Sequence, residues 1–146
     1  MGICAGAYLA CSNRDWNLHL LNADWFGPQT SRGEGFLDLE LTPEGRGLCG
    51  DVQGTFKVFY NNGPAIKPGT DAGLPPYTVL SYFRTEVADN GSEVGVMVNT
   101  PAQAMSTFGK GRVFICSPHP EATAGLEHML PRFILWAAGK TSLPTP

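Results

Sequence analysis

The chain has 146 residues, of which 42% are hydrophobic and 16% are charged, with a net charge of −3. This length suits one domain with a substantial core, so we expect a single domain over 1–146 with a flexible tail at 139–146. The slight negative charge lacks the basic footprint of a nucleic-acid binder. The longest apolar run, Phe133–Ala138, is too short to cross a bilayer. We therefore expect neither nucleic acid nor a membrane as a partner.

The first half of the chain contains one predicted helix and two predicted strands. Ala5–Cys11 consists of good helix formers without a β-branched residue, which predicts a helix. Phe36–Leu41 alternates apolar and polar residues, which predicts a half-buried strand inside the otherwise loop-like Asp24–Gly54. Thr55–Tyr60 alternates again, and the turn residues Asn61-Asn62-Gly63-Pro64 end it.

The second half favours an antiparallel hairpin and a buried strand. Tyr77–Val87 predicts a strand, Asp89–Ser92 has the composition of a hairpin turn, and Glu93–Val98 is expected to return antiparallel. Arg112–Cys116 is apolar at consecutive positions, which is typical of a strand buried on both faces.

The last predicted element is a helix over Leu126–Ala137, because its apolar residues recur every three to four positions. Gly139 suits the C-terminal cap of this helix. Pro131 interrupts the pattern, so we expect a kink or two short helices.

The four cysteines are not spaced as in a metal site. No Cys-x-x-Cys pair occurs, so we expect no metal, and nothing in the sequence calls for a cofactor. A chain of this size does not need disulfides, which favours free thiols in the reducing cytoplasm. Cys11, Cys49 and Cys116 are interpreted as buried apolar residues.

The fourth cysteine lies in Gly2-Ile3-Cys4-Ala5-Gly6. A cysteine between small residues, at a turn directly before a helix, has the layout of a nucleophile elbow. Free N–H groups at the start of the helix favour the thiolate, which is the reactive form. The N–H of Ala5 would point toward a developing oxyanion. A structural cysteine buried at a helix start is the alternative.

A second segment that could carry catalytic residues is Ser117-Pro118-His119-Pro120-Glu121. The prolines favour extended backbone around the histidine, and residues i and i+2 of an extended segment project to the same side. Glu121 is therefore predicted to orient the ring of His119, and a cysteine nucleophile needs a base held in this way. The alternative is a loop histidine followed by a carboxylate in the first turn of the next helix.

The two segments, taken together, resemble the class I glutamine amidotransferase superfamily. The resemblance is greatest to the branch named after the N-terminal domain of biotin–protein ligase. Phe59–Pro64 also resembles that branch, in which Tyr-Asn-Gly-Gly-Pro is usual, so Asn62 replaces a glycine. The similarity covers most of the chain, from residue 2 to about 138.

The resemblance implies a flavodoxin-like α/β fold with a central, mostly parallel sheet flanked by helices. It also implies a triad with Cys4 as nucleophile, His119 as base and Glu121 as the orienting carboxylate. We expect three further residues beside a small-molecule substrate: Tyr60, Asn61 and Gly63.

One departure from the family concerns the start of the chain. The family has a stretch before the elbow that supplies the first strands and a second oxyanion donor, whereas here the cysteine is the fourth residue. We expect a truncated relative, a mis-started gene, or a minimal version whose sheet is completed by a homodimer or a partner chain.

Three functions stay open at this stage. The favoured one is an enzyme, a Cys-His-Glu hydrolase that acts on a small amide or related acyl substrate. The second is a non-catalytic binding or regulatory module of the same fold, and the third is redox sensing by a reactive thiolate. Arg32 could bind a substrate carboxylate but is interpreted as not doing so. Four aromatic residues could line a pocket near Cys4 but are interpreted mainly as core: Trp16, Trp25, Phe26 and Tyr60.

Overall fold

The structure is a computed structural model that describes residues 1–27, 32–50 and 52–142. The end of the predicted tail, 143–146, lies outside the described residues. The elements in chain order are β1 (Gly2–Ile3), α1 (Ala5–Ala10), β2 (Ala23–Trp25), β3 (Glu34–Leu41), α2 (Pro43–Cys49), β4 (Thr55–Asn61), β5 (Ile66–Pro68), β6 (Thr78–Phe83), β7 (Pro101–Phe108), β8 (Gly111–Cys116), the 3₁₀ turn η1 (Pro120–Ala122) and α3 (Met129–Ala137).

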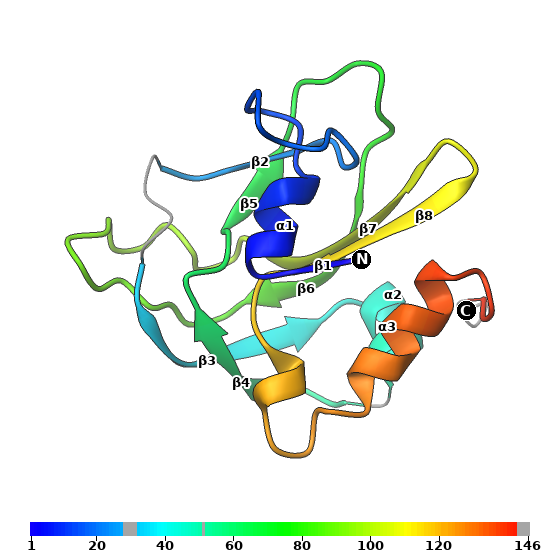
Figure 1. The fold of residues 1–146 in the computed structure, drawn as a ribbon. Coiled ribbons are helices and arrows are strands. Elements are labelled where there is room, and N and C mark those ends of the chain that lie inside the picture. Colours follow the sequence, from blue (N-terminus) through cyan, green and yellow to red (C-terminus); the bar gives the residue numbers. More distant parts are fainter. Residues whose placement is uncertain (28–31, 51, 143–146) are drawn as a thin grey trace.

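Six of the described strands form one curled sheet in the order β1-β8-β7-β6-β3-β4, and β2 pairs separately with β5 (Figure 1). The β1–β8 pair is parallel, and the other neighbours described in the sheet are antiparallel. The fold is therefore α/β with a mixed sheet, and the predicted mostly parallel sheet is wrong. The two-residue connection of Gly109 and Lys110 explains the antiparallel β7–β8 pair, because so short a turn joins only antiparallel strands.

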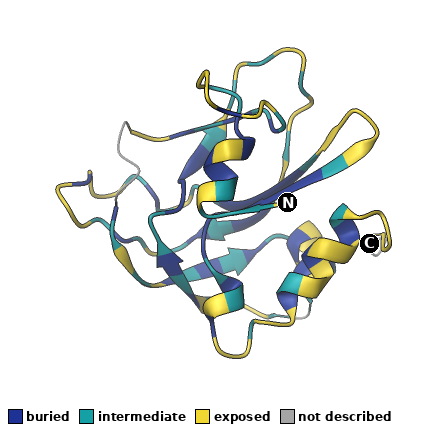
Figure 2. Cartoon of the chain, viewed as in Figure 1, coloured by how far each residue is buried: buried dark blue, intermediate teal, exposed yellow. Residues whose placement is uncertain are grey.

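Strand β8 lies between two hydrophobic cores. Val113 and Ile115 belong to the core that contains residues of α1. Phe114 and Cys116 alternate with them and pack with Phe133 and other residues of α3. The prediction of a strand buried on both faces is confirmed, and Figure 2 shows the buried residues concentrated along the strands.

A third core covers the β3 and β4 end of the sheet. Leu37 and Leu39 alternate with more exposed neighbours along β3, as the period-two pattern predicted. Val87 and Met97 close this core from the segment 84–100, which follows β6 and contains no strand. The predicted Tyr77–Val87 strand thus ends early, at Phe83.

The predicted hairpin with a return strand over Glu93–Val98 is wrong, because side chains bind the backbone groups that a strand pair would use. The buried guanidinium of Arg32 donates to the carbonyl oxygens of Val87 and Glu93, at 3.2 and 2.9 Å. The carboxylate of Glu86 accepts from the N–H of Gly95 at 2.6 Å. The antiparallel neighbour of β6 is instead β7.

Two helices differ from expectation. Helix α2 lies in the stretch interpreted as loop-like and begins at a local signal, since the hydroxyl of Thr42 accepts from the N–H of Gly45. Helix α3 begins at Met129, so Pro131 falls in its first turn and the expected kink is absent from this described helix. Gly139 caps α3 at a φ of 71°, as predicted. None of the helices in the described ranges has the length and apolar character that a bilayer crossing requires.

Candidate active site

Cys4 occupies a sharp turn between β1 and α1. Its φ of 51° and ψ of −107° lie in a region that residues with a Cβ rarely adopt. The backbone N–H of Cys4 donates to the carbonyl oxygen of Cys116 at 2.8 Å. A Cβ on Gly2 would overlap the carbonyl oxygen of Gly6, so the turn needs glycine at position 2. The geometry is that of the predicted nucleophile elbow.

Strand pairing brings the histidine segment to the same edge of the sheet. Gly2 and Ile3 of β1 pair in parallel with Ile115 and Cys116 of β8. Both strands therefore end side by side, and the residues that follow them meet at one edge. Cys4 follows the first strand and His119 follows the second.

The backbone of His119 is fixed by strand β4. Its N–H donates to the carbonyl oxygen of Phe59 at 2.7 Å. The hydroxyl of Thr123 donates to the carbonyl oxygen of His119 at 2.8 Å and accepts from the N–H of Phe59 at 3.0 Å. The ring of Phe59 lies 5.9 Å from the imidazole, centroid to centroid. These contacts hold the histidine segment against the sheet.

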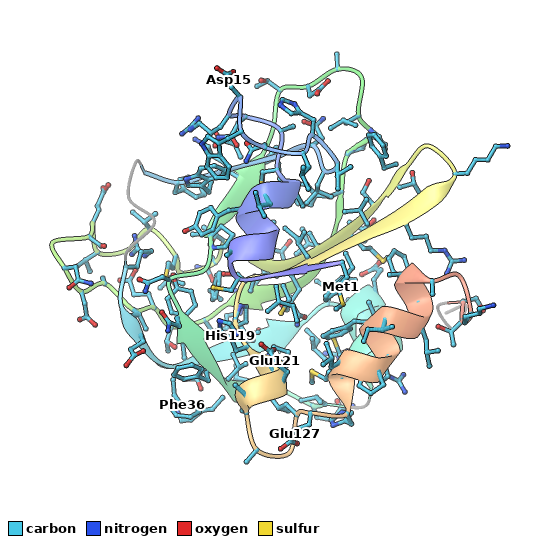
Figure 3. The ribbon with its side chains drawn as sticks, in the orientation of Figure 1. Met1, Asp15, Phe36, His119, Glu121 and Glu127 are labelled. Atoms are coloured by element: carbon cyan, nitrogen blue, oxygen red, sulfur yellow. The ribbon has the colours of Figure 1, made fainter. Side chains whose placement is uncertain are left out.

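The ring of His119 is oriented by a carboxylate. Nδ1 of His119 lies 2.7 Å from Oε1 of Glu121, as a direct hydrogen bond, and Figure 3 shows the two side chains together below the start of α1. Oε2 of Glu121 is buried and makes no hydrogen bond within the described structure. The contact predicted from an extended segment is present, although Glu121 lies in the 3₁₀ turn η1, which begins at Pro120.

A cavity of about 630 Å³ is lined by Cys4 and His119, whereas Glu121 lies outside its described lining. Four of the predicted site residues line it, namely Cys4, Ala5, Asn61 and His119, and the other lining residues are Tyr8, Leu9, Trp16 and Asn62. Clefts of this volume are typical of small-molecule sites. Trp16 is 53% exposed, so its interpretation as core is wrong. Its position after α1 is the signal that would have linked it to the elbow.

Tyr60 and Gly63 lie behind the cavity and do not line it. Tyr60 is fully buried, and its hydroxyl donates to the carbonyl oxygen of Gly63 at 2.7 Å. A Cβ on Gly63 would overlap the carbonyl oxygen of Ser117. Neither residue therefore lies beside the cavity as expected, because Tyr60 belongs to the core at the β3 and β4 end of the sheet and Gly63 lies against Ser117, which follows β8.

Asn62 holds the turn at a left-handed φ of 57°, a conformation that asparagine tolerates better than most residues. Its Oδ1 accepts from the N–H of Gly33 at 2.7 Å, and its Nδ2 donates to Oδ1 of Asn61 at 2.7 Å. These two hydrogen bonds fix the backbone at Asn62.

The surroundings of Cys4 favour its protonated thiol over the thiolate. Burial raises the pKa of Cys4; the N–H of Ala5 opposes this effect, and the carboxylate of Glu121 adds to it. Sγ donates to the carbonyl oxygen of Asn61 at 3.0 Å. As expected, the N–H of Ala5 at the start of the helix favours the thiolate, but desolvation raises the pKa of Cys4 more strongly.

The other three cysteines are free and buried, as predicted. Among residues 1–27, 32–50 and 52–142, no three His, Cys, Asp or Glu side chains are grouped so that they could hold a metal ion. The chemistry that these residues can support is nucleophilic attack by sulfur with proton transfer through an imidazole.

Comparisons with known proteins identify the fold. No protein-family model matches the chain, and no curated protein is significantly similar to it. A crystal structure of a glutamine amidotransferase aligns with 94% of this chain at a TM-score of 0.52 and 23% sequence identity. The alignment covers 59% of the length of that amidotransferase. The chain therefore has the fold of a glutamine amidotransferase.

Proposed function

We propose that the protein is a glutamine amidotransferase-like hydrolase with a Cys4–His119–Glu121 triad, acting on a small amide or related acyl substrate. The observation that carries the proposal is that Cys4, on a strained elbow, and His119, bonded to Glu121, line one cavity. The likeness in fold to a solved glutamine amidotransferase supports the superfamily. The segment Phe59–Pro64 favours the biotin–protein ligase branch within it.

The first half of the reaction acylates the enzyme. With the Nδ1–H of His119 donating to Glu121, Nε2 is free to accept a proton. The Cys4 sulfur attacks the substrate carbonyl carbon while the thiol proton passes to Nε2. The tetrahedral intermediate then expels the amine or alcohol, which takes the proton from Nε2, and a thioester remains on Cys4.

The second half releases the acid. A water molecule gives a proton to Nε2 of His119, its oxygen attacks the thioester carbon, and the C–S bond breaks. The proton then returns to the sulfur. One water is consumed, and one carboxylic acid and one amine or alcohol are released. The N–H of Ala5, which lines the cavity next to Cys4, is the proposed donor to the oxyanion in both halves.

The raised pKa of Cys4 makes the base essential in this scheme. A thiol that is protonated at neutral pH is a weak nucleophile until its proton is removed. His119 must therefore act during the attack, rather than maintain a thiolate beforehand.

The proposal is tested by the hydrolysis of p-nitrophenyl acetate by the wild type, Cys4→Ala, His119→Ala and Cys11→Ala. Cys4→Ala should lose turnover and His119→Ala should lose about 10²- to 10⁴-fold in kcat. Cys11→Ala should retain activity, because that thiol is buried away from the cavity. Equal turnover by Cys4→Ala and the wild type would refute the proposal, and a wild type inactive on every ester and amide would favour the non-catalytic module.

A further inference from the structure

Part of the lining of the cavity is apolar and exposed. Leu9 of α1 is 42% exposed and Trp16, in the loop after α1, is 53% exposed, yet both face the same cavity as Cys4. Asp15, the sequence neighbour of Trp16, marks this loop above α1 in Figure 3. Apolar side chains gathered around a cleft mark a surface that a ligand covers.

Trp16 is held in place by the packing beneath it. Its ring lies 5.6 Å from that of Trp25, and Trp25 packs edge-on to Tyr8 at 5.0 Å. The buried Asn17 fixes the turn, since its Nδ2 donates to the carbonyl oxygen of Tyr8 at 2.9 Å and its Oδ1 accepts from the N–H of Arg14 at 2.7 Å. An aromatic wall held in this way is preorganised for an apolar group.

The described lining of the cavity carries no Asp, Glu, Lys or Arg. Three charged residues lie outside this lining. Arg32 is buried, with its guanidinium 3.6 Å from Glu86, and the guanidinium of Arg14 lies 4.9 Å above the ring of Trp25. Glu34 accepts from Nδ2 of Asn61 at 3.3 Å. A glutamyl group would bring an ammonium and a carboxylate into a space whose described lining offers no charged partner, which is less favourable than an apolar acyl group.

We infer that the cavity selects substrates with a neutral, apolar acyl group, aryl or alkyl, and disfavours the charged glutamyl group. The inference rests on the proposed function and assigns its substrate class. The acyl chain lies against Trp16 and Leu9, while the carbonyl lies between Cys4 and the polar side formed by Asn61 and His119. The volume of about 630 Å³ leaves room for an aromatic ring beyond the reacting carbon.

The test compares three amides with one leaving group: the p-nitroanilides of acetate, 3-phenylpropionate and γ-glutamate. The 3-phenylpropionyl amide should exceed the γ-glutamyl amide by about 100-fold in kcat/KM. Trp16→Ala should lower the ratio of phenylpropionyl to acetyl turnover by about tenfold or more. Phe108→Ala, which removes an exposed aromatic ring from the β7–β8 hairpin outside the cavity, should leave that ratio unchanged.

Binding to the inactive Cys4→Ala protein separates this inference from the proposed function. Calorimetry should detect 3-phenylpropionamide binding more tightly than L-glutamine, with the preference lost when Trp16→Ala is added. Tighter binding of glutamine, or faster turnover of the γ-glutamyl amide, would overturn the inference and leave the hydrolase intact. Selective binding by a protein whose wild type hydrolyses none of the three amides would instead overturn the proposed function alone.

Discussion

Cys4 combines a strained backbone with a half-buried thiol. A non-glycine residue at this φ and ψ costs of order 1–3 kcal/mol and persists only where the surrounding structure enforces it. Here the N–H bond to Cys116 and the packing of Gly2 against Gly6 enforce it. Such strain is typical of functional sites, because it presents a side chain that relaxed backbone would turn away.

This strain predicts an unusual response to glycine. Cys4→Gly should be more stable than Cys4→Ala by about 1 kcal/mol, because glycine adopts a positive φ freely. Both variants should be inactive. The measurement is the free energy of unfolding in urea.

Cys11 provides the matched control. Its φ is −62°, so its backbone carries no strain that a glycine could remove. Cys11→Gly should therefore be less stable than Cys11→Ala. A Cys4→Gly variant no more stable than Cys4→Ala would show that the elbow is unstrained.

The sequence identified candidate site residues, but it did not predict the direction in which the pKa of Cys4 shifts. The small residues around Cys4 and the prolines around His119 singled out two local patterns that the fold places beside one cavity. The raised pKa of Cys4 depends on burial by distant segments, so no local pattern announced it. The same reason applies to two aromatic residues. Tyr60 was expected beside the substrate but is buried in the core, whereas Trp16 was interpreted mainly as core but lines the cavity.

The β1–α1 unit depends on one of its two glycines. A Cβ on Gly2 would overlap the carbonyl oxygen of Gly6, whereas a Cβ on Gly6 meets no atom within 4 Å. The spacing Gly-x-Cys-x-Gly suggested that both positions need small residues, but the crowding is confined to the first.

Two alanine substitutions should therefore act in opposite directions. Gly2→Ala should destabilise the protein and lower hydrolysis, because the elbow must shift away from His119. Gly6→Ala should raise the free energy of unfolding by up to about 1 kcal/mol, since alanine is the better helix former in α1. Urea denaturation of both variants checks this, and a Gly6→Ala variant destabilised as much as Gly2→Ala would contradict it.

Elements with strong periodicity were predictable, and the others were not. Alternation located β3 and β4, and the consecutive apolar run located β8. Strand β7 was missed because Pro101–Phe108 begins with proline and contains two Ala, one Gln and one Ser, which have no marked strand preference. Helix α2 contains two glycines that mask it, although Thr42-Pro43 is a clear start signal.

At the scale of the whole molecule, the first and last strands that the structure describes, β1 and β8, pair with each other. This pairing creates the site, and it lay beyond sequence reasoning because no local pattern specifies which strands become neighbours. A single domain, a homodimer or partner chain, and a cytoplasmic location stay predictions.

Buried thiols make the whole fold sensitive to alkaline pH. Burial raises the pKa of Cys11 and of Cys49 from the ordinary 9.0 to about 12. Below pH 9 both states keep these protons, so the thiols have no effect on stability there. Between pH 9 and 12 only the unfolded state loses them, so stability falls as pH rises.

Each thiol should lower the free energy of unfolding by about 1.4 kcal/mol between pH 8 and pH 10. Urea denaturation at the two pH values measures this loss of stability. In Cys49→Ala the loss should be smaller by about 1.4 kcal/mol, the contribution of one thiol. An equal loss in Cys49→Ala and the wild type would contradict the assignment.

The most direct test of the central claim is to trap the acyl-enzyme. The wild type and His119→Ala would be mixed with p-nitrophenyl acetate, quenched in acid at successive times and mapped by mass spectrometry. The account predicts an acetyl group on Cys4 alone, appearing about 10²-fold or more slowly without His119. An acetyl group on another residue, or equal rates of acetylation in the two proteins, would contradict it.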